Sequence, residues 1–196
     1  MYLYAIVMGL IVGKVRKGKW NKLNHVQIKL PLLMMAALVL QFSMFFLNIS
    51  GTQIAARILD GLLLGSMSII LISLIINRHI KYWYLVFIGI LINYVLIILN
   101  GVRIGVTEEA ALKAFGPELF QLIEAGAVYF YTIIPQDVFY RGAFIAFEKL
   151  FIYPAVLTIG DLIIFMGVVV LVQNLMTDKT IRPGVKIKYS KKLFKN

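Results

Sequence analysis

The sequence predicts an all-α integral membrane bundle of five transmembrane helices, with the N-terminus outside, the C-terminus inside and interfacial helices in a long outer segment. Three observations predict this fold class. Hydrophobic residues make up 61% of the chain and charged residues only 15%, whereas soluble domains are about half apolar and a quarter charged. The apolar residues gather in five runs, and Lys and Arg gather on every second connection between these runs.

Four of the apolar runs have the length of a transmembrane helix. A helix needs about 20 apolar residues to cross the hydrocarbon core of a bilayer. We expect these spans at residues 30–48, 58–76, 83–100 and 155–176.

The first apolar run, residues 2–13, is shorter, because Lys14 and Arg16 follow Gly13. We expect the helix to continue through Val15, so that the first span covers residues 2–15. At about 1.5 Å per residue it is short for a core of about 30 Å. This helix can cross the membrane if the long side chains of Lys14 and Arg16 reach back to the head groups. A signal peptide carries its positive charge before the apolar run, whereas here the charge follows. We therefore expect a retained helix with its N-terminus outside.

Positive charge sets the predicted orientation, because cytoplasmic loops are enriched in Lys and Arg. Residues 13–29, 77–82 and 177–196 hold all but five of the 20 Lys and Arg, so we place them inside. The five on the outer side are Arg57, Arg103, Lys113, Arg141 and Lys149. The sequence thus predicts a single transmembrane domain, residues 1–176, and a basic cytoplasmic tail, residues 177–196.

Composition also limits the chemistry that we expect. Topology alone accounts for the net charge of +11, so we expect membrane lipid as a partner and no nucleic acid. The chain has no cysteine, which excludes disulfides and Cys-ligated metal centres. The two histidines lie in loops without other ligands nearby. We therefore predict no catalytic residue, no metal site and no cofactor.

Residues 101–153 form the one long connection, which we expect to be structured on the outer side. Thr107 followed by Glu108 and Glu109 indicates the start of a helix, because the hydroxyl can accept a hydrogen bond from a backbone amide and the acids oppose the helix dipole. The dipeptide Gly116-Pro117 ends that helix and begins another.

The second half of this connection is rich in aromatic residues, which are favoured at the head-group level of a membrane. We interpret Gln136 to Phe151 as a helix that lies on the outer interface. One alternative is that residues 126–151 form a helical hairpin or a re-entrant segment. Another is that the aromatic side chains line a ligand groove.

Small residues predict where the helices pack, because helices in a bilayer associate through close backbone approach. Gly9 and Gly13 lie four residues apart in the first helix, and Gly61 and Gly65 do so in the third. We expect both pairs to pack within this bundle. Packing between chains is the alternative.

Two carboxylates lie within predicted spans, where each charge costs about 2.5 to 3.5 kcal/mol and therefore needs a partner or a role. Asp60 can pair with Arg57 one turn earlier. Asp161 and Asn93 lie at similar depths in their helices, about 9 Å from the outer end, and we expect at least one arginine to approach Asp161. Asn93 shares an inward helix face with Gly89 and Asn100.

These observations define a candidate outer-leaflet polar cluster. Its members are Arg57, Asp60, Asn93, Asn100, Arg103, Arg141 and Asp161.

Several short motifs resemble an uncharacterised domain-of-unknown-function family of small polytopic membrane proteins from Gram-positive bacteria. The residues that carry the resemblance are Gly9-Leu10, Gly13-Lys14-x-Arg16-x-Gly18-Lys19, Asn100-Gly101-x-Arg103, Ile159-Gly160-Asp161 and Gly167. The resemblance implies five spans in a bacterial plasma membrane and supplies no activity.

We expect the protein to act as a non-enzymatic accessory or scaffold subunit of a plasma-membrane complex, with other membrane-protein subunits or a second copy as partner. The alternative is a small-solute or ion transporter that uses the polar cluster around Asp161, because intramembrane ionisable groups commonly mark such paths.

Overall fold

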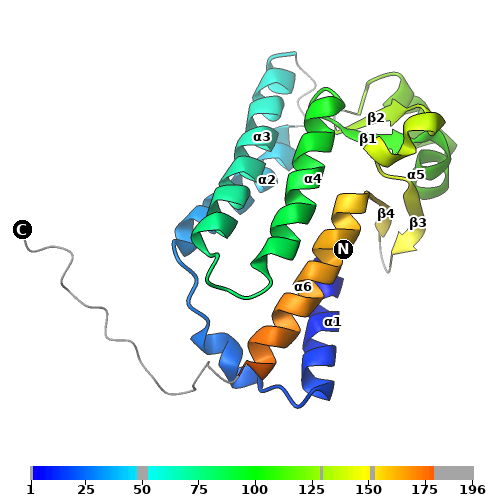
Figure 1. Ribbon diagram of the computed structural model, residues 1–196. Coiled ribbons are helices and arrows are strands. Elements are labelled where there is room, and N and C mark those ends of the chain that lie inside the picture. The colour runs from blue at the N-terminus through cyan, green and yellow to red at the C-terminus, as the bar shows by residue number, and fades with distance from the viewer. Residues whose placement is uncertain (1, 48–52, 129, 151–152, 179–196) are drawn as a thin grey trace, which may run out of the picture.

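The computed structural model describes residues 2–47, 53–128, 130–150 and 153–178. The described part is a bundle of five apolar helices with a small α/β unit at one end (Figure 1). The bundle helices are α1 (Tyr2–Val15), α2 (Pro31–Leu47), α3 (Gln53–Ile76), α4 (Trp83–Leu99) and α6 (Ile159–Thr177). Helices therefore occupy all five apolar runs, as the sequence predicts.

Two of these helices are long and apolar enough to cross a membrane. The segments are Ile58–Ile76 in α3 and Ile159–Thr177 in α6. The other apolar helical segments are shorter, at Leu3–Val15, Pro31–Gln41 and Trp83–Leu99. The arrangement of five crossings therefore stays a prediction.

Glycines bring α1 and α6 into close contact. A Cβ atom on Gly9 would lie 2.7 Å from Cβ of Val172, and one on Gly13 would lie 2.6 Å from Sδ of Met176. At Gly9 the added atom would overlap Val172, and at Gly13 it would require the Met176 side chain to shift. Both glycines thus lie in close contact with α6, so the predicted packing of this pair within the bundle is confirmed. Gly9 contacts Val172, and Gly13, four residues later, contacts Met176, which is also four residues later. The contacts therefore advance together along α1 and α6, so the two helices run in the same direction.

The second glycine pair behaves differently. No atom in the described part of the chain lies within 4 Å of a Cβ atom built on Gly61 or Gly65. The structure thus supplies no close contact within the bundle for this pair, and packing between chains stays open as the alternative.

Loops close the end of the bundle where α1 and α6 finish, and they include the 3-10 helix η1 (Trp20–His25). The Lys19 amide donates to the Met176 carbonyl at 3.0 Å. The buried Asn77 side chain accepts from the Lys29 amide at 2.7 Å and donates to the Lys29 carbonyl at 3.0 Å. These bonds join the α1–α2 connection both to α6 and to the turn between α3 and α4.

The outer segment forms an α/β unit at the opposite end (Figure 1). Its elements are β1 (Ile104–Thr107), α5 (Glu108–Glu124), β2 (Tyr131–Ile134), η3 (Gln136–Arg141), β3 (Ile145–Leu150) and β4 (Tyr153–Leu157). β1 and β2 pair in parallel across α5, and β3 pairs with β4 in the antiparallel sense. Val106, Ala110, Ala111 and Ala143 are its buried core. Small alanines let α5 lie close against the strands.

This unit corrects two predictions. The fold class is not all-α, because four short strands occur in the described residues. The described residues of the stretch Gln136 to Phe151 are not an interfacial α-helix, because they form mainly the short 3-10 helix η3 and the strand β3. The described part of residues 126–151 is likewise not a helical hairpin, because its elements are β2, η3 and β3. The alternative of a re-entrant segment stays a prediction. Strand pairing joins residues that are far apart in sequence, as when the Ile104 amide donates to the Phe130 carbonyl at 2.8 Å. Aromatic residues are enriched in strands, but aromatic content does not show which distant segment a strand pairs with.

The first part of the outer segment follows its predicted pattern. The Thr107 hydroxyl accepts from the Ala110 amide at 3.3 Å and caps α5, whose first turn carries Glu108 and Glu109. Gly116 has φ +79°, which breaks the helix before Pro117. Both the helix start and the break at Gly116-Pro117 are confirmed.

The two glycine pairs yield a direct test of the packing. Gly9→Ala should lower stability by about 1 to 3 kcal/mol, because its Cβ overlaps Val172 in a packed contact. Gly61→Ala should be neutral or raise stability by about 0.5 to 1 kcal/mol, because the position is open and alanine favours a helix. Unfolding of both variants in the same detergent measures the difference. Equal destabilisation by the two substitutions would contradict this packing.

Candidate functional site

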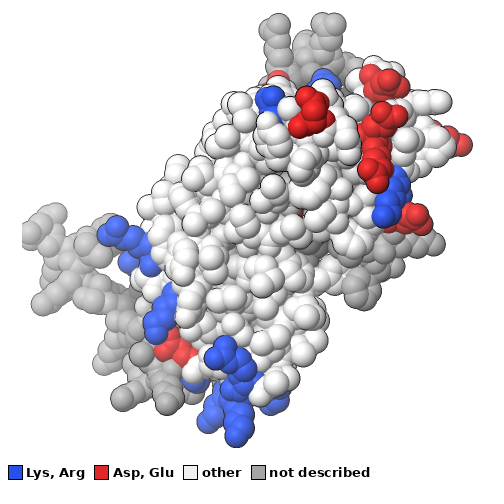
Figure 2. Space-filling view, turned by 45° about the vertical axis from the view of Figure 1, so that its right-hand side comes forward, with Lys and Arg blue, Asp and Glu red and all other residues white. Residues whose placement is uncertain are grey.

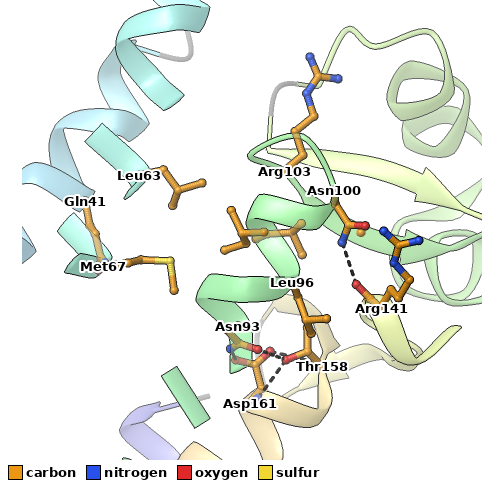
Figure 3. Close-up of a pocket in the computed structure, with 14 residues that line it drawn as sticks. Gln41, Leu63, Met67, Asn93, Leu96, Asn100, Arg103, Arg141, Thr158 and Asp161 are labelled. Carbon is orange, nitrogen blue, oxygen red and sulfur yellow. Dashed lines mark hydrogen bonds between the residues drawn. The ribbon is translucent and has the colours of Figure 1, made fainter. Parts of the chain in front are cut away.

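Five of the seven predicted cluster residues surround one cavity of about 190 Å³ at the end of the bundle that carries the α/β unit (Figure 3). Its walls come from α2, α3, α4, the start of β1, the end of η3 and the start of α6. The five cluster residues on its lining are Asn93, Asn100, Arg103, Arg141 and Asp161. The lining residues come from five separate stretches of the chain, which converge here.

Asn93 and Asp161 form the polar centre of the site. The Asn93 Nδ2 donates to Oδ1 of Asp161 at 2.9 Å, which confirms that the two residues lie in one layer. The Thr158 hydroxyl donates to the Asn93 Oδ1 at 2.6 Å. Both polar atoms of the buried Asn93 side chain are therefore satisfied, as a polar group within an apolar bundle requires.

Thr158 and Asp161 also cap the start of α6. The Thr158 hydroxyl accepts from the Asp161 amide at 3.0 Å, and the Asp161 Oδ2 accepts from the Thr158 amide at 3.0 Å. This reciprocal pair is a capping box, which satisfies two backbone amides that have no partner within the helix. The carboxylate also lies at the positive end of the helix dipole. Both Asp161 oxygens thus accept hydrogen bonds within the fold.

Glycines allow α4 and α6 to meet at this level. A Cβ atom on Gly160 would collide with the Asn93 side chain and lie 2.7 Å from the Gly89 carbonyl oxygen. A Cβ atom on Gly89 would lie 2.6 Å from Cγ1 of Ile164. The α4 face with Gly89 and Asn93 therefore packs against α6, which confirms that it faces inward.

Asn100 joins the end of α4 to the outer segment. Its Nδ2 donates to the Arg141 carbonyl at 2.7 Å, and Nη2 of Arg141 donates to the Leu99 carbonyl at 3.4 Å. The Ala143 amide donates to the Gly105 carbonyl at 2.7 Å and attaches the chain after η3 to β1. These bonds fix η3 against the end of α4.

The structure does not place two predicted members of the polar cluster at the cavity. Asp60 is on α3 and is not part of the cavity lining, and the side chain of Arg57 lies outside the described residues. Figure 3 shows the Arg103 side chain directed away from Asp161. The expected approach of an arginine to Asp161 stays a prediction.

The sequence reasoning missed Thr158 and Tyr131. The pattern Thr158-x-x-Asp161 is a readable capping-box signal. No comparable signal marks Tyr131, a β2 residue in the core of the outer segment. Burial raises the pKa of the Tyr131 hydroxyl, and the negative charge of Asp161 raises it further. Within the described residues, no group of three His, Asp or Glu side chains is placed to hold a metal ion.

Fold and site together define a mainly helical protein with apolar helices, a capped polar cluster and a small α/β outer unit. The sequence matches the family described as "Family of unknown function (DUF5317)" over residues 25–173, and the chain belongs to this family. The resemblance to a domain-of-unknown-function family is thereby confirmed. No curated protein and no solved structure matches the chain. The matched range includes every residue of the cavity lining, whereas α1 precedes it.

Thr158 provides a test of the polar centre. Thr158→Ala should cost about 2 to 4 kcal/mol, because it removes the helix cap and leaves the buried Asn93 oxygen without its donor. Thr158→Ser keeps the hydroxyl and should recover most of this loss. Thr177→Ala at the other end of α6 is the control, since its hydroxyl only bonds back to the preceding turn. Equal stabilities of Thr158→Ala and Thr177→Ala, measured by chemical unfolding, would rule out this role.

The raised pKa of Tyr131 predicts a pH dependence. The unfolded chain releases the phenol proton near the ordinary pKa of 10.0, whereas the folded protein retains it to higher pH. This contribution to stability is complete below about pH 10 and is lost as pH rises through the folded pKa. Wild-type stability should therefore fall relative to Tyr131→Phe above about pH 10. A stability difference between the two proteins that is constant up to about pH 11 would refute the prediction.

Proposed function

We propose that the protein is a five-crossing integral protein of the plasma membrane and acts as a non-enzymatic accessory or scaffold subunit. The N-terminus lies outside and the C-terminus inside. The α/β outer segment contacts another membrane-protein subunit or a second copy of the chain.

Large apolar side chains on the surface support the membrane placement. They are exposed on all five bundle helices, for example Leu3 at 68%, Leu32 at 77%, Ile72 at 52%, Ile98 at 49% and Met166 at 61%. Soluble proteins rarely expose apolar surface on this scale. The three helices that are short for a span carry such side chains as well, which favours five crossings over two.

The distribution of charge supports the orientation. Figure 2 shows Lys and Arg gathered at one end of the molecule, most of the acids toward the other end and an uncharged band between them. The basic end includes exposed Lys14 in the last turn of α1 and exposed Arg16 and Lys17 just after that helix. Cytoplasmic loops are enriched in such residues. The parallel direction of α1 and α6 also agrees with an odd number of crossings.

The observation that carries the scaffold role is the fixed attachment of the outer segment. The Asn100–Arg141 bond ties η3 to α4, and the Thr158–Asn93 bond ties the end of β4 to the same helix. A unit held at two points keeps one orientation relative to the membrane, as a docking platform requires. Two other bonds, from the Asn93 side-chain amide and from the Thr158 backbone amide, satisfy both Asp161 oxygens within the fold, which supports a positioning role for this carboxylate over a role in transport.

Loosening the attachment tests the function. Asn100→Ala removes the bond to the Arg141 carbonyl and should lower recovery of a stoichiometric partner or homo-oligomer in mild detergent by about tenfold, as expected for the loss of about 1.4 kcal/mol of coupling. Gln173→Ala, at the opposite end of the bundle, is the control and should keep full recovery. A wild-type protein that is strictly monomeric and has no partner would contradict the proposal.

Topology is checked separately with the cysteine-free chain. Lys17→Cys and Lys113→Cys place single thiols at exposed positions near opposite ends of the bundle. A membrane-impermeant maleimide added outside intact cells should label position 113 only. Labelling of both positions from outside would refute the orientation and leave the partner experiment unaffected.

A further inference from the structure

We propose that the groove between α5 and the end of β2 binds an extended segment of another polypeptide, which adds a strand to the free edge of β2 and directs basic side chains toward Glu108 and Glu109. The groove is open, has a volume of about 710 Å³, and is formed by the first turns of α5 and by residues 133–136. This inference rests on the proposed scaffold role and names the kind of partner that the outer segment binds.

β1 and β2 differ in how their edges are satisfied. β1 lies between β2 and the chain after η3, because the Ala143 amide donates to the Gly105 carbonyl at 2.7 Å and the Thr107 amide donates to the Ala143 carbonyl at 3.2 Å. β2 pairs with β1 alone in the described part of the chain. An edge strand presents a row of backbone donors and acceptors. The second edge of β2 is therefore open to a further strand.

Tyr131 and Ile133 face this free edge. The Ile104 amide donates to the Phe130 carbonyl at 2.8 Å, so the backbone groups of every second residue from Phe130 onward point toward β1. Those of Tyr131 and Ile133 point the opposite way, where no described residue bonds to them. Pro135 follows the strand and has no amide hydrogen. Pairing is thus limited to the four residues of β2, or about 13 Å.

Acidic and apolar side chains lie beside this edge. Glu108 and Glu109 are exposed, and neither makes an ion pair with a described residue. Leu112, one turn later, is exposed and forms an apolar wall of the groove. Glu108 and Leu112 are about 6 Å apart along the helix axis, and alternate residues on one face of a strand are about 6.6 Å apart. One face of an added strand therefore matches both kinds of side chain.

The charges favour a different protein over a second copy of this chain. Figure 2 shows the Lys and Arg of this chain gathered at the opposite end of the molecule. The five Lys and Arg on the outer side lie at least eight positions apart in sequence. An added strand of about four residues from a second copy thus cannot bring two basic side chains to the two carboxylates. The partner is a chain with two Lys or Arg and an apolar residue on one face of an extended segment.

Binding of a defined peptide to the full chain in a neutral detergent tests the proposal. The probe is the blocked, fluorescent peptide Lys-Thr-Lys-Thr-Val-Thr, whose two Lys and Val share one face of a strand. Fluorescence anisotropy should show saturable binding at one site per chain. The same peptide with Glu in place of both Lys should bind at least about tenfold more weakly. A backbone N-methylated form should lose binding to the same extent, because it cannot pair with a strand edge.

A matched pair of charge variants locates the site on α5. The double variant Glu108→Gln, Glu109→Gln should bind the Lys peptide about tenfold more weakly. Glu118→Gln, Glu124→Gln removes two exposed carboxylates from the second half of the same helix, outside the groove, and should bind as wild type.

A second pair keeps the test decisive if loss of the two acids weakens the start of α5. Leu112→Ser removes the apolar wall without changing charge and should weaken binding of the Lys peptide by about tenfold. Leu122→Ser changes a leucine that is also exposed on α5 but lies outside the groove, and it should have no effect.

Three results would overturn the proposal. They are equal binding of the Lys and Glu peptides, undiminished binding of the N-methylated form, and an equal loss of binding in the control variants. Self-association that Leu112→Ser abolishes and Leu122→Ser preserves would assign the groove to a second copy and would likewise overturn it.

The outcome is separable from that of the proposed function. Peptide binding is measured on the isolated chain, whereas the scaffold role is read from partner recovery. A chain that recovers a partner but does not bind the Lys peptide loses only the groove as its docking site. A chain that binds the peptide, yet is strictly monomeric and has no partner, contradicts only the scaffold role.

Discussion

The hydrogen-bonded group of Asn93, Thr158 and Asp161 sets the arrangement of the whole outer half of the molecule. An unpaired amide or carboxylate in an apolar bundle costs several kcal/mol. Here these polar atoms are satisfied by four hydrogen bonds among the three side chains and the backbone amides of Thr158 and Asp161. The donor–acceptor distances are 2.6 to 3.0 Å. Sliding α4 against α6 by one turn would break these bonds at once, so only one register of the two helices is stable. Because β4 runs directly into Thr158, the same group also fixes where the outer segment ends and α6 starts.

This interaction needs close approach of two backbones, and glycine makes that approach possible. Gly160 faces Asn93 and Gly89, while Gly167 lies against the start of α4, where a Cβ would be 2.9 Å from the Val86 amide nitrogen. Farther along α6, the contacts of Gly9 and Gly13 bring in α1. α6 is therefore the helix around which α1 and α4 pack. The hairpin of α2 and α3 lies outside this set of glycine contacts, and the cavity is found between it and the α4–α6 pair.

The sequence predicted what depends on local chemistry. The apolar runs predicted the five bundle helices. Thr107 and Gly116 predicted the start of α5 and the break within it. Counting residues from the helix ends placed Asn93 level with Asp161. The strands escaped prediction because β1 and β2 have four residues each and pair across a helix of 17 residues. The depth of a residue along its helix follows from counting residues in the sequence. Which other helices that residue contacts does not follow from such a count. Asp60 was therefore predicted to join the polar cluster, whereas α3 contributes Leu63 and Met67 to the cavity lining.

The short first helix has a structural consequence under the proposed membrane placement. The offset between Gly9 and Val172 and between Gly13 and Met176 puts Tyr2 level with Phe165, six residues inside the outer end of α6. That step is about 9 Å deep, so α1 does not reach the first six residues of α6. The aromatic part of the outer segment exposes Phe139 at 44%, Tyr140 at 53% and Phe147 at 38%, and such rings are favoured at the head-group level. The interfacial aromatic chemistry that the sequence indicated is thus compatible with strands as well as with a helix, because the bilayer interacts with side chains and not with the secondary structure that carries them.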